Sequence, residues 1–337
     1  MKIIFIILLI ISCLLCSDDG QGIIVNNFPV KGELNAHIHH IESPILLPRY
    51  MGIEDGYLFV YKEREEFLFT MFRLPKLEFV NNMGKRGQGP NEFNILDTRS
   101  FNTCNNGLFS VLEAGSNMLK SVRFDNGKLE VFESEKMFDM GIKHNGLYSL
   151  NENKWLTMGA LEEDNEYCLI DKHTKEAVKS ECYPEWTKIQ GKNAPPKFVT
   201  YLKSCVVHPE GNMFASFYGR FKRMRIYNED MKLIHDVNIK TEPCKTSFDE
   251  PVEKQPVYYI GQPYATEKHI YALCANKNTG VDRCELHVFD WSGNPSACYS
   301  FDRNVSLIAI STEYGKIYAL DKRLPDELYV YDLPLND

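Results

Sequence analysis

Short runs of alternating hydrophobic and polar residues recur along this chain and predict β-strands. The runs are rich in Val, Ile, Tyr and Phe and are bounded by residues typical of turns. The predicted strands are 56–63, 67–74, 107–113, 118–125, 128–134, 154–161, 166–172, 212–219, 223–230, 269–276, 284–291, 316–321 and 327–333. No segment sustains the period of a helix, so the pattern predicts an all-β, antiparallel fold.

Three segments share one internal pattern of strands and turns and indicate a repeat. They are 58–80, 212–239 and 269–301, and repeats of this kind are spaced by about 40–50 residues, the period of a propeller blade. The chain has room for six blades. Propeller rings close by pairing early with late strands, so we expect 23–28 or 37–43 to complete the blade that holds 316–333.

The N-terminus carries a targeting signal. Lys2 precedes the apolar run 3–11, which is too short to span a bilayer and ends near a cysteine. This arrangement resembles a bacterial lipoprotein signal, in which a cysteine becomes the lipidated first residue. Cys13 follows a small serine, whereas Cys16 precedes an acidic stretch resembling surface-export signals, and both stay open as lipidation sites. We expect residues 1–16 to be the signal peptide with its lipidation site and 17–337 to be one domain.

Export places the remaining cysteines where disulfides persist. Cys274 and Cys284 flank one predicted hairpin, and Cys168 and Cys182 flank another, so both pairs are candidate disulfides. The alternative is that these thiols are free and buried. No C-x-x-C spacing follows residue 16, which disfavours zinc or thioredoxin-type chemistry.

A loop rich in glycine connects the strands of 67–80 to the next unit. It lacks the Lys-Ser or Lys-Thr of a Walker loop and the third glycine and βαβ context of a dinucleotide-binding loop, so it predicts a chain turn and not phosphate binding. It reads Gly84, Lys85, Arg86, Gly87, Gln88, Gly89, Pro90, Asn91, Glu92 and Phe93.

This loop resembles the G-x-x-G-x-G-P-x-E-F signature of TolB-like, NHL-like six-bladed β-propeller lipoproteins of Gram-negative bacteria. Residues 288–333 also resemble late blades of that family. The resemblance implies a single six-bladed β-propeller of antiparallel blades. In the loop, glycines permit unusual backbone angles, Pro90 stiffens the turn, and Phe93 anchors it between blades. Glu92 is expected to accept backbone N–H bonds or to pair with Arg86.

Charge and motifs constrain the chemistry. The net charge of −8 disfavours nucleic acid as a partner, because that binding needs Lys and Arg against phosphates. We expect the basic run 220–225 to be a solvated strand face. The chain lacks the serine-hydrolase, zinc-protease and EF-hand motifs, and we assign no catalytic residue, metal ligand or cofactor.

Three weaker patterns have a structural and a functional interpretation. His37 and His39 share a strand face that suits a metal or is simply exposed. The acidic run 162–166 suits calcium or a solvated loop. The three tryptophans suit sugar stacking or blade cores, and the second interpretation is favoured in each case. They are Trp155, Trp186 and Trp291.

The leading functional hypothesis is a non-catalytic binding module, anchored by lipid in the outer membrane and periplasmic or surface-exposed. Its partner would be a glycan, a peptide or an envelope protein held at the funnel of the ring or on rim loops. The alternative is an enzyme, because similarly shaped propellers include calcium-dependent lactonases and lyases. Three or more carboxylate, Asn or His groups converging in the channel would mark it. A structural part of an envelope assembly, by analogy with TolB, would show a large apolar patch.

Overall fold

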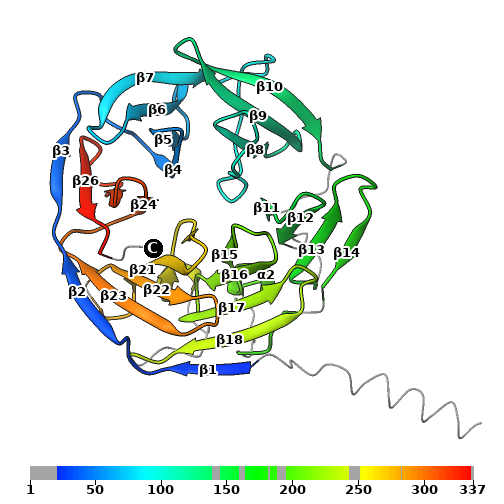
Figure 1. The fold of residues 1–337 in the computed structure, drawn as a ribbon, viewed down its shortest axis with the longest axis vertical. Coiled ribbons are helices and arrows are strands. Elements are labelled where there is room, and N and C mark those ends of the chain that lie inside the picture. The colour runs from blue at the N-terminus through cyan, green and yellow to red at the C-terminus, as the bar shows by residue number, and fades with distance from the viewer. Residues whose placement is uncertain are drawn as a thin grey trace, which may run out of the picture.

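The computed structural model describes residues 21–138, 145–158, 164–180, 183–187, 195–242, 251–281 and 283–334. Six small sheets stand around a central axis and form a six-bladed propeller (Figure 1). Each of the predicted strands overlaps a strand of this ring, which confirms the all-β class.

We number the blades along the chain. Blade one contains β4 (Pro48–Glu54), β5 (Tyr57–Lys62), β6 (Phe67–Arg73) and β7 (Glu78–Lys85). Blade two contains β8 (Phe109–Glu113), β9 (Met118–Asp125) and β10 (Lys128–Lys136). Blade three contains β11 (Asn145–Ser149), β12 (Lys154–Met158), β13 (Tyr167–Asp171) and β14 (Ala177–Lys179).

The later blades also take strands from the start of the chain. Blade four contains β15 (Lys203–Val207), β16 (Met213–Tyr218), β17 (Arg223–Asn228), β18 (Leu233–Ile239) and β1 (Gln21–Val25). Blade five contains β19 (Val257–Tyr259), β20 (Tyr264–Ala265), β21 (His269–Lys277), β22 (Glu285–Asp290), β23 (Pro295–Phe301) and β2 (Val30–Leu34). Blade six contains β24 (Leu307–Ser311), β25 (Lys316–Leu320), β26 (Glu327–Asp332) and β3 (His37–His40). Two short helices, α2 (Lys197–Thr200) and η1 (Val252–Lys254), precede β15 and β19.

The ring closes through β3, which pairs antiparallel with β26 and places Ile38 opposite Tyr329. Of the two segments expected to complete the last blade, 37–43 therefore does so. The segment 23–28 instead contributes β1, which runs parallel to β18 on blade four, and β2 lies parallel to β23 on blade five. These early strands form the dark blue belt outside the ring and cover sheet edges that would otherwise be open (Figure 1).

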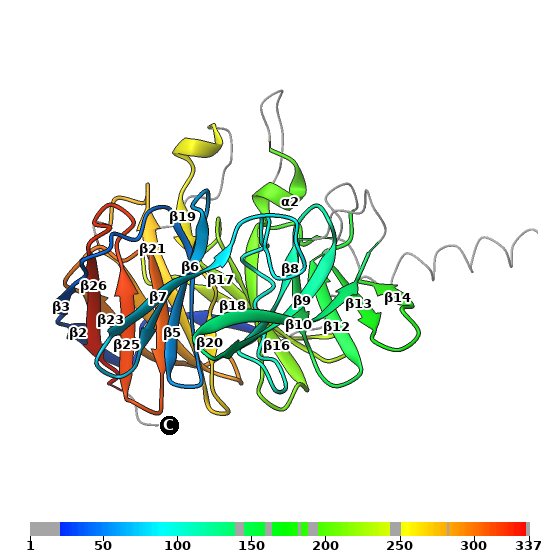
Figure 2. The same ribbon diagram turned by 90° about the horizontal axis from the view of Figure 1, so that it is seen from above.

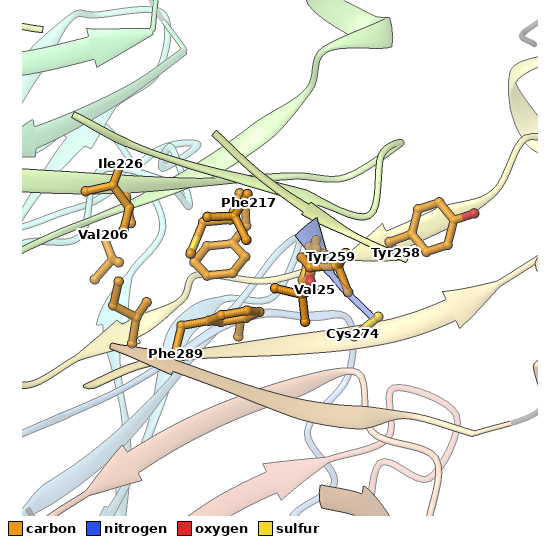
Figure 3. Close-up of a cluster of buried hydrophobic side chains, with 14 of the residues drawn as sticks. Val25, Val206, Phe217, Ile226, Tyr258, Tyr259, Cys274 and Phe289 are labelled. Carbon is orange, nitrogen blue, oxygen red and sulfur yellow. The ribbon is translucent and has the colours of Figure 1, made fainter. Parts of the chain in front are cut away.

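The hydrophobic core is divided among the contacts between neighbouring blades. Each junction holds its own cluster, and Figure 3 shows the cluster between blades four and five, where Phe217 faces Phe289. Phe59 and Phe109 stack in the cluster between blades one and two, with ring centroids 4.8 Å apart. Blade order is thus fixed by side-chain packing, because the strands of different blades share few backbone hydrogen bonds.

The glycine-rich loop turns the chain from blade one into blade two. Gly87 N–H donates to the carbonyl of Phe93 at 2.9 Å, and Phe93 N–H donates to Lys85 at 3.0 Å. The Glu92 carboxylate accepts the N–H of Gly89 at 2.9 Å and fills the space where a Cβ on Gly87 would lie, 1.9 Å from Oε2. Phe93 is fully buried between the blades, with its ring 5.6 Å from that of Phe69.

The disulfide expected between Cys274 and Cys284 does not form, because both cysteines are free thiols. Cys274 pairs across the hairpin with Glu285, so Cys284 is one residue out of register. Successive residues of a strand point to opposite faces, and the two thiols accordingly lie in different core clusters. Cys168 is buried in the cluster between blades two and three, and Cys182 lies outside the described residues.

Candidate functional site: the central channel

The innermost strands of the blades line a channel along the ring axis. One part of it is a cavity of about 250 Å³ whose wall combines aromatic and aliphatic side chains with several polar ones. Tyr50 stacks flat on Phe101, with centroids 4.1 Å apart and planes 5° from parallel, and Ile308 lies on the wall contributed by blade six. A pocket of this kind suits the apolar part of a small molecule.

A second cavity of about 230 Å³ continues the channel, and Tyr50, Met51, Gln262 and Ile308 line both cavities. We call it the basic mouth. Four cationic side chains line it, and the lining formed by described residues contains no carboxylate. The four are Arg49, Arg99, Lys277 and Lys322.

The fold brings these cations together from distant parts of the chain. Arg49 is the second residue of β4, Lys277 is the last residue of β21, and Lys322 follows β25. Arg99 lies in a turn entering blade two, where its N–H donates to the side chain of Asp97 at 3.0 Å. The mouth opens where the inner strands begin, on the face that carries α2 and the short yellow helix η1 (Figure 2).

The basic mouth keeps an excess of positive charge. Arg49 pairs with Glu63 at 2.8 Å. Within the described part of the chain, the ammonium groups of Lys277 and Lys322 have no ion-pair or hydrogen-bond partner. Desolvation, followed by the positive charges of Arg49 and Lys277, lowers the pKa of the exposed Lys322 against the opposing effect of Glu63. The arrangement favours a bound anion, which would relieve the repulsion between like charges.

The apolar part of the channel offers few groups for chemistry. Its described lining contains one carboxylate, Glu54, and one asparagine, Asn102. Asn102 is used structurally: its amide donates to Ser100 and Leu147 carbonyls at 2.8 and 2.9 Å and accepts the N–H of Ser149 at 2.8 Å. Asn102 therefore joins blade two to blade three.

One group of metal-type ligands lies buried among the described residues, formed by Cys274, Glu285 and His287. Their polar atoms already have partners. Glu285 Oε2 is 3.2 Å from His287 Nε2 and accepts from Asn276 at 3.0 Å, while Cys274 donates to Asn276 at 3.3 Å. Burial would raise the pKa of Glu285, but the hydrogen bonds from His287 and Asn276 hold it well below its usual range. We interpret the group as a closed hydrogen-bonded network within blade five.

The histidines and tryptophans singled out from the sequence lie away from this channel lining. His37 is exposed and His39 half-buried on β3, the outer strand of blade six. Trp155 and Trp291 are only 8% exposed and pack in blade junctions. Trp186 packs edge-on against Phe221, with centroids 5.2 Å apart.

The residues of the acidic run 162–166 lie in different environments. Residues 162 and 163, like Cys13 and Cys16, lie outside the described residues. Asp164 is exposed and pairs with Lys197 at 3.0 Å. Glu166 is buried and pairs with Lys203 at 3.0 Å, so it belongs to the interior between blades three and four.

The prediction that the basic run 220–225 forms a solvated face is wrong. Lys222 and Arg225 are buried. Arg225 pairs with Asp236 at 2.8 Å, and Lys222 donates to Thr241 at 3.0 Å. Carboxylate and hydroxyl groups that follow in the chain compensate these charges, and the sequence of the run alone does not show which partners will face it.

Comparison with known proteins agrees with this architecture. A family described as "TolB-like 6-blade propeller-like" matches residues 36–313. The chain belongs to this TolB-like propeller family. No curated protein matches the chain.

Three solved structures are similar to this TolB-like propeller at low sequence identity. A member of the duf4221 family from Bacteroides vulgatus is 12% identical, with a TM-score of 0.61, covering 89% of this chain and 97% of that one. Hydrazine synthase from Kuenenia stuttgartiensis is 10% identical, with a TM-score of 0.46 and coverages of 83% and 75%. Glutaminyl cyclase from Myxococcus xanthus is 12% identical, with a TM-score of 0.42 and coverages of 90% and 98%. The first match shows the fold alone, and the other two carry no further argument.

None of the helices among the described residues is long and apolar enough to cross a membrane.

Proposed function

We propose that this TolB-like propeller is an exported, lipid-anchored module of the cell envelope that binds a ligand without transforming it. Its ligand enters the central channel through the basic mouth. The lipid, attached at Cys13 or Cys16, holds the propeller at the outer membrane. The lipoprotein-like N-terminus supports the location, and the channel supports the activity.

The observation that carries the binding role is a channel that divides into a charged entrance and an apolar interior. Binding sites are typically concave and apolar, with a few polar groups that fix the orientation of the ligand. Here the wall around Tyr50 and Phe101 supplies the apolar surface, and the mouth supplies the charges. A propeller that served only as a scaffold would need neither feature.

The enzyme alternative would be favoured by three or more carboxylate, asparagine or histidine groups that converge in the channel. The described lining of the apolar cavity brings only Glu54 and Asn102 there, and Asn102 is engaged in joining two blades. The groups that do come together in this channel are the four cationic side chains at the mouth. Such a cluster suits recognition of an anion.

A thermal-shift panel on the purified mature protein tests the binding role. Calcium, zinc, EDTA, oligosaccharides, peptides and amphiphilic acids are added one at a time. A ligand that binds only the folded state raises the melting temperature by an amount that grows with its concentration. A rise with one organic class supports the binding module. A rise with metal that EDTA reverses, together with turnover of a lactone or polyuronate, would replace it with the enzyme.

A further inference from the structure

We propose that the channel of this propeller holds a small amphiphilic anion, with its acidic head at the basic mouth and its apolar body against the aromatic wall. The inference rests on the proposed binding function and specifies the ligand class. It follows from the order of the two cavities along one channel, with Tyr50 at their junction.

The head group must be anionic because of what faces it. Lys277 and Lys322 reach the same cavity from blades five and six, and among the described residues neither ammonium has a partner. Arg49 comes from blade one with Glu63 on one side of its guanidinium. A carboxylate or a phosphate monoester accepts charge-assisted hydrogen bonds from such groups, whereas a neutral head would leave the two ammonium groups close to each other.

The polar rim adds uncharged hydrogen-bonding groups. Ser204, Gln262 and Ser306 line the mouth beside the cations. Hydroxyl and amide groups donate hydrogen bonds to the oxygen lone pairs of an acidic head that the cations leave free, and so fix its orientation. The mouth therefore provides charge and directional hydrogen bonds within one cavity of about 230 Å³.

The body is expected to be largely apolar because aromatic and aliphatic side chains form the larger share of the wall beyond Tyr50. Phe101 stacks on Tyr50, and Ile308, Ala309 and Val206 complete the surface around the cavity of about 250 Å³. A simple inorganic anion would leave this cavity unfilled. A glycan would place many of its hydroxyl groups against the aromatic and aliphatic side chains, where they lose hydrogen bonds to water.

The size of the channel limits the ligand to a small molecule. Two adjoining cavities of about 250 and 230 Å³, which share lining residues, suit a chain or ring system with a single head group. The chemistry of the head is shared by carboxylic acids and phosphate monoesters, so the experiment compares both. The expected class is a medium-chain or aromatic acid, or the corresponding phosphate.

The test is isothermal titration of the mature protein with four probes. Dodecanoate and dodecyl phosphate carry both parts, each used below its micelle concentration, whereas dodecanol lacks the charge and inorganic phosphate lacks the chain. We expect at least one amphiphilic anion to bind at least tenfold more tightly than dodecanol and phosphate. Raising the salt concentration should weaken this binding, because the mouth contacts solvent.

Variants separate the two halves of the site. The double variant Lys277→Gln with Lys322→Gln should lower the affinity for the amphiphilic anion at least tenfold and leave the affinity for dodecanol unchanged. Ile308→Asn should lower the affinity for the probes that carry an alkyl chain. Lys128→Gln, an exposed lysine at the start of the outer strand β10, is the matched control and should change nothing. Circular dichroism and melting temperature verify that each variant folds.

The outcomes distinguish the inference from the proposed function. If dodecanol bound as tightly as dodecanoate, the acidic head would not contribute to binding. If inorganic phosphate bound as tightly as dodecyl phosphate, the apolar body would not contribute. Binding of an oligosaccharide or peptide that is insensitive to the lysine pair would overturn this inference and leave the binding module standing. If neither these probes nor the ligand panel bind, both proposals fail.

Discussion

Removing Lys203 should destabilise the propeller far more than removing an exposed lysine. Lys203 Nζ lies 3.0 Å from Glu166 Oε1, and the two side chains are only 2% and 4% exposed. Its ammonium also lies over the rings of Tyr167, Tyr183 and Tyr218, between 4.7 and 5.3 Å from their centroids. Lys203→Met keeps most of the volume and leaves the Glu166 carboxylate buried without its counter-charge.

The expected magnitude follows from this burial. Breaking a buried ion pair on one side costs about 3–5 kcal/mol, chiefly because the remaining charge is uncompensated. Glu166 keeps the hydroxyl groups of Tyr218 at 2.5 Å and Tyr227 at 3.3 Å, so the cost should fall near the lower end, about 3 kcal/mol. The double variant Lys203→Met with Glu166→Gln should recover part of it, because no buried charge remains.

Urea unfolding followed by tryptophan fluorescence measures the effect. The matched control is Lys154→Met, since Lys154 pairs with Asp230 at 2.7 Å while 31% and 68% of the two side chains are exposed. Such a surface pair contributes about 0–1 kcal/mol. If Lys203→Met lowered the free energy of unfolding no more than Lys154→Met does, the argument from burial would be refuted.

Three further predictions concern separate parts of the chain. Burial lowers the pKa of His287, so its folded form stays neutral. Its contribution to stability is present above the unfolded pKa of about 6.5 and is lost as pH falls toward the folded pKa, and His287→Gln should flatten this slope in pH-dependent unfolding. Glu92→Ala should cost about 1–2 kcal/mol in urea unfolding, because the Gly89 N–H loses its carboxylate partner; an unchanged midpoint would contradict this. Labelling with an alkyne fatty acid should disappear in one of the two single variants, Cys13→Ala or Cys16→Ala, which identifies the lipidated cysteine. If labelling survived in the variant that lacks both cysteines, neither would be the lipidation site.

The sequence was sufficient for the middle strands of every blade, and 37–43 was one of the two segments expected to close the ring. These strands alternate clearly because one face packs against a neighbouring blade. The inner strands β4 and β15 were not predicted. They mix charged and apolar residues and face the channel on one side, so neither the helical nor the alternating pattern stands out.

Buried charges were the other failure of sequence reasoning. A run such as 220–225 resembles a solvated face because charged residues are almost never buried without partners. The partner of Arg225 is Asp236 on the next strand, and Glu285 similarly depends on Asn276 across a hairpin. Pairing of this kind depends on strand register, which local patterns do not specify.

The basic mouth also escaped prediction, because its cations come from four blades and are separated by up to most of the chain. Arg49 and Lys322 belong to the first and last blades, which become neighbours only when the ring closes. Resemblance to a propeller family predicts that a channel exists. It does not predict which side chains point into the channel, since that depends on the turn geometry in each blade.

The net charge of −8 and a cationic channel are compatible, and together they select partners by size. At physiological ionic strength, charges separated by more than about 8 Å are largely screened. A small anion at the mouth therefore responds to Lys277 and Lys322, and hardly at all to carboxylates on the outer strands. A long polyanion such as nucleic acid would extend beyond the mouth over a molecule whose net charge is −8 and be repelled by it. The composition that disfavours nucleic acid is thus compatible with the small acidic ligand that we propose for the channel.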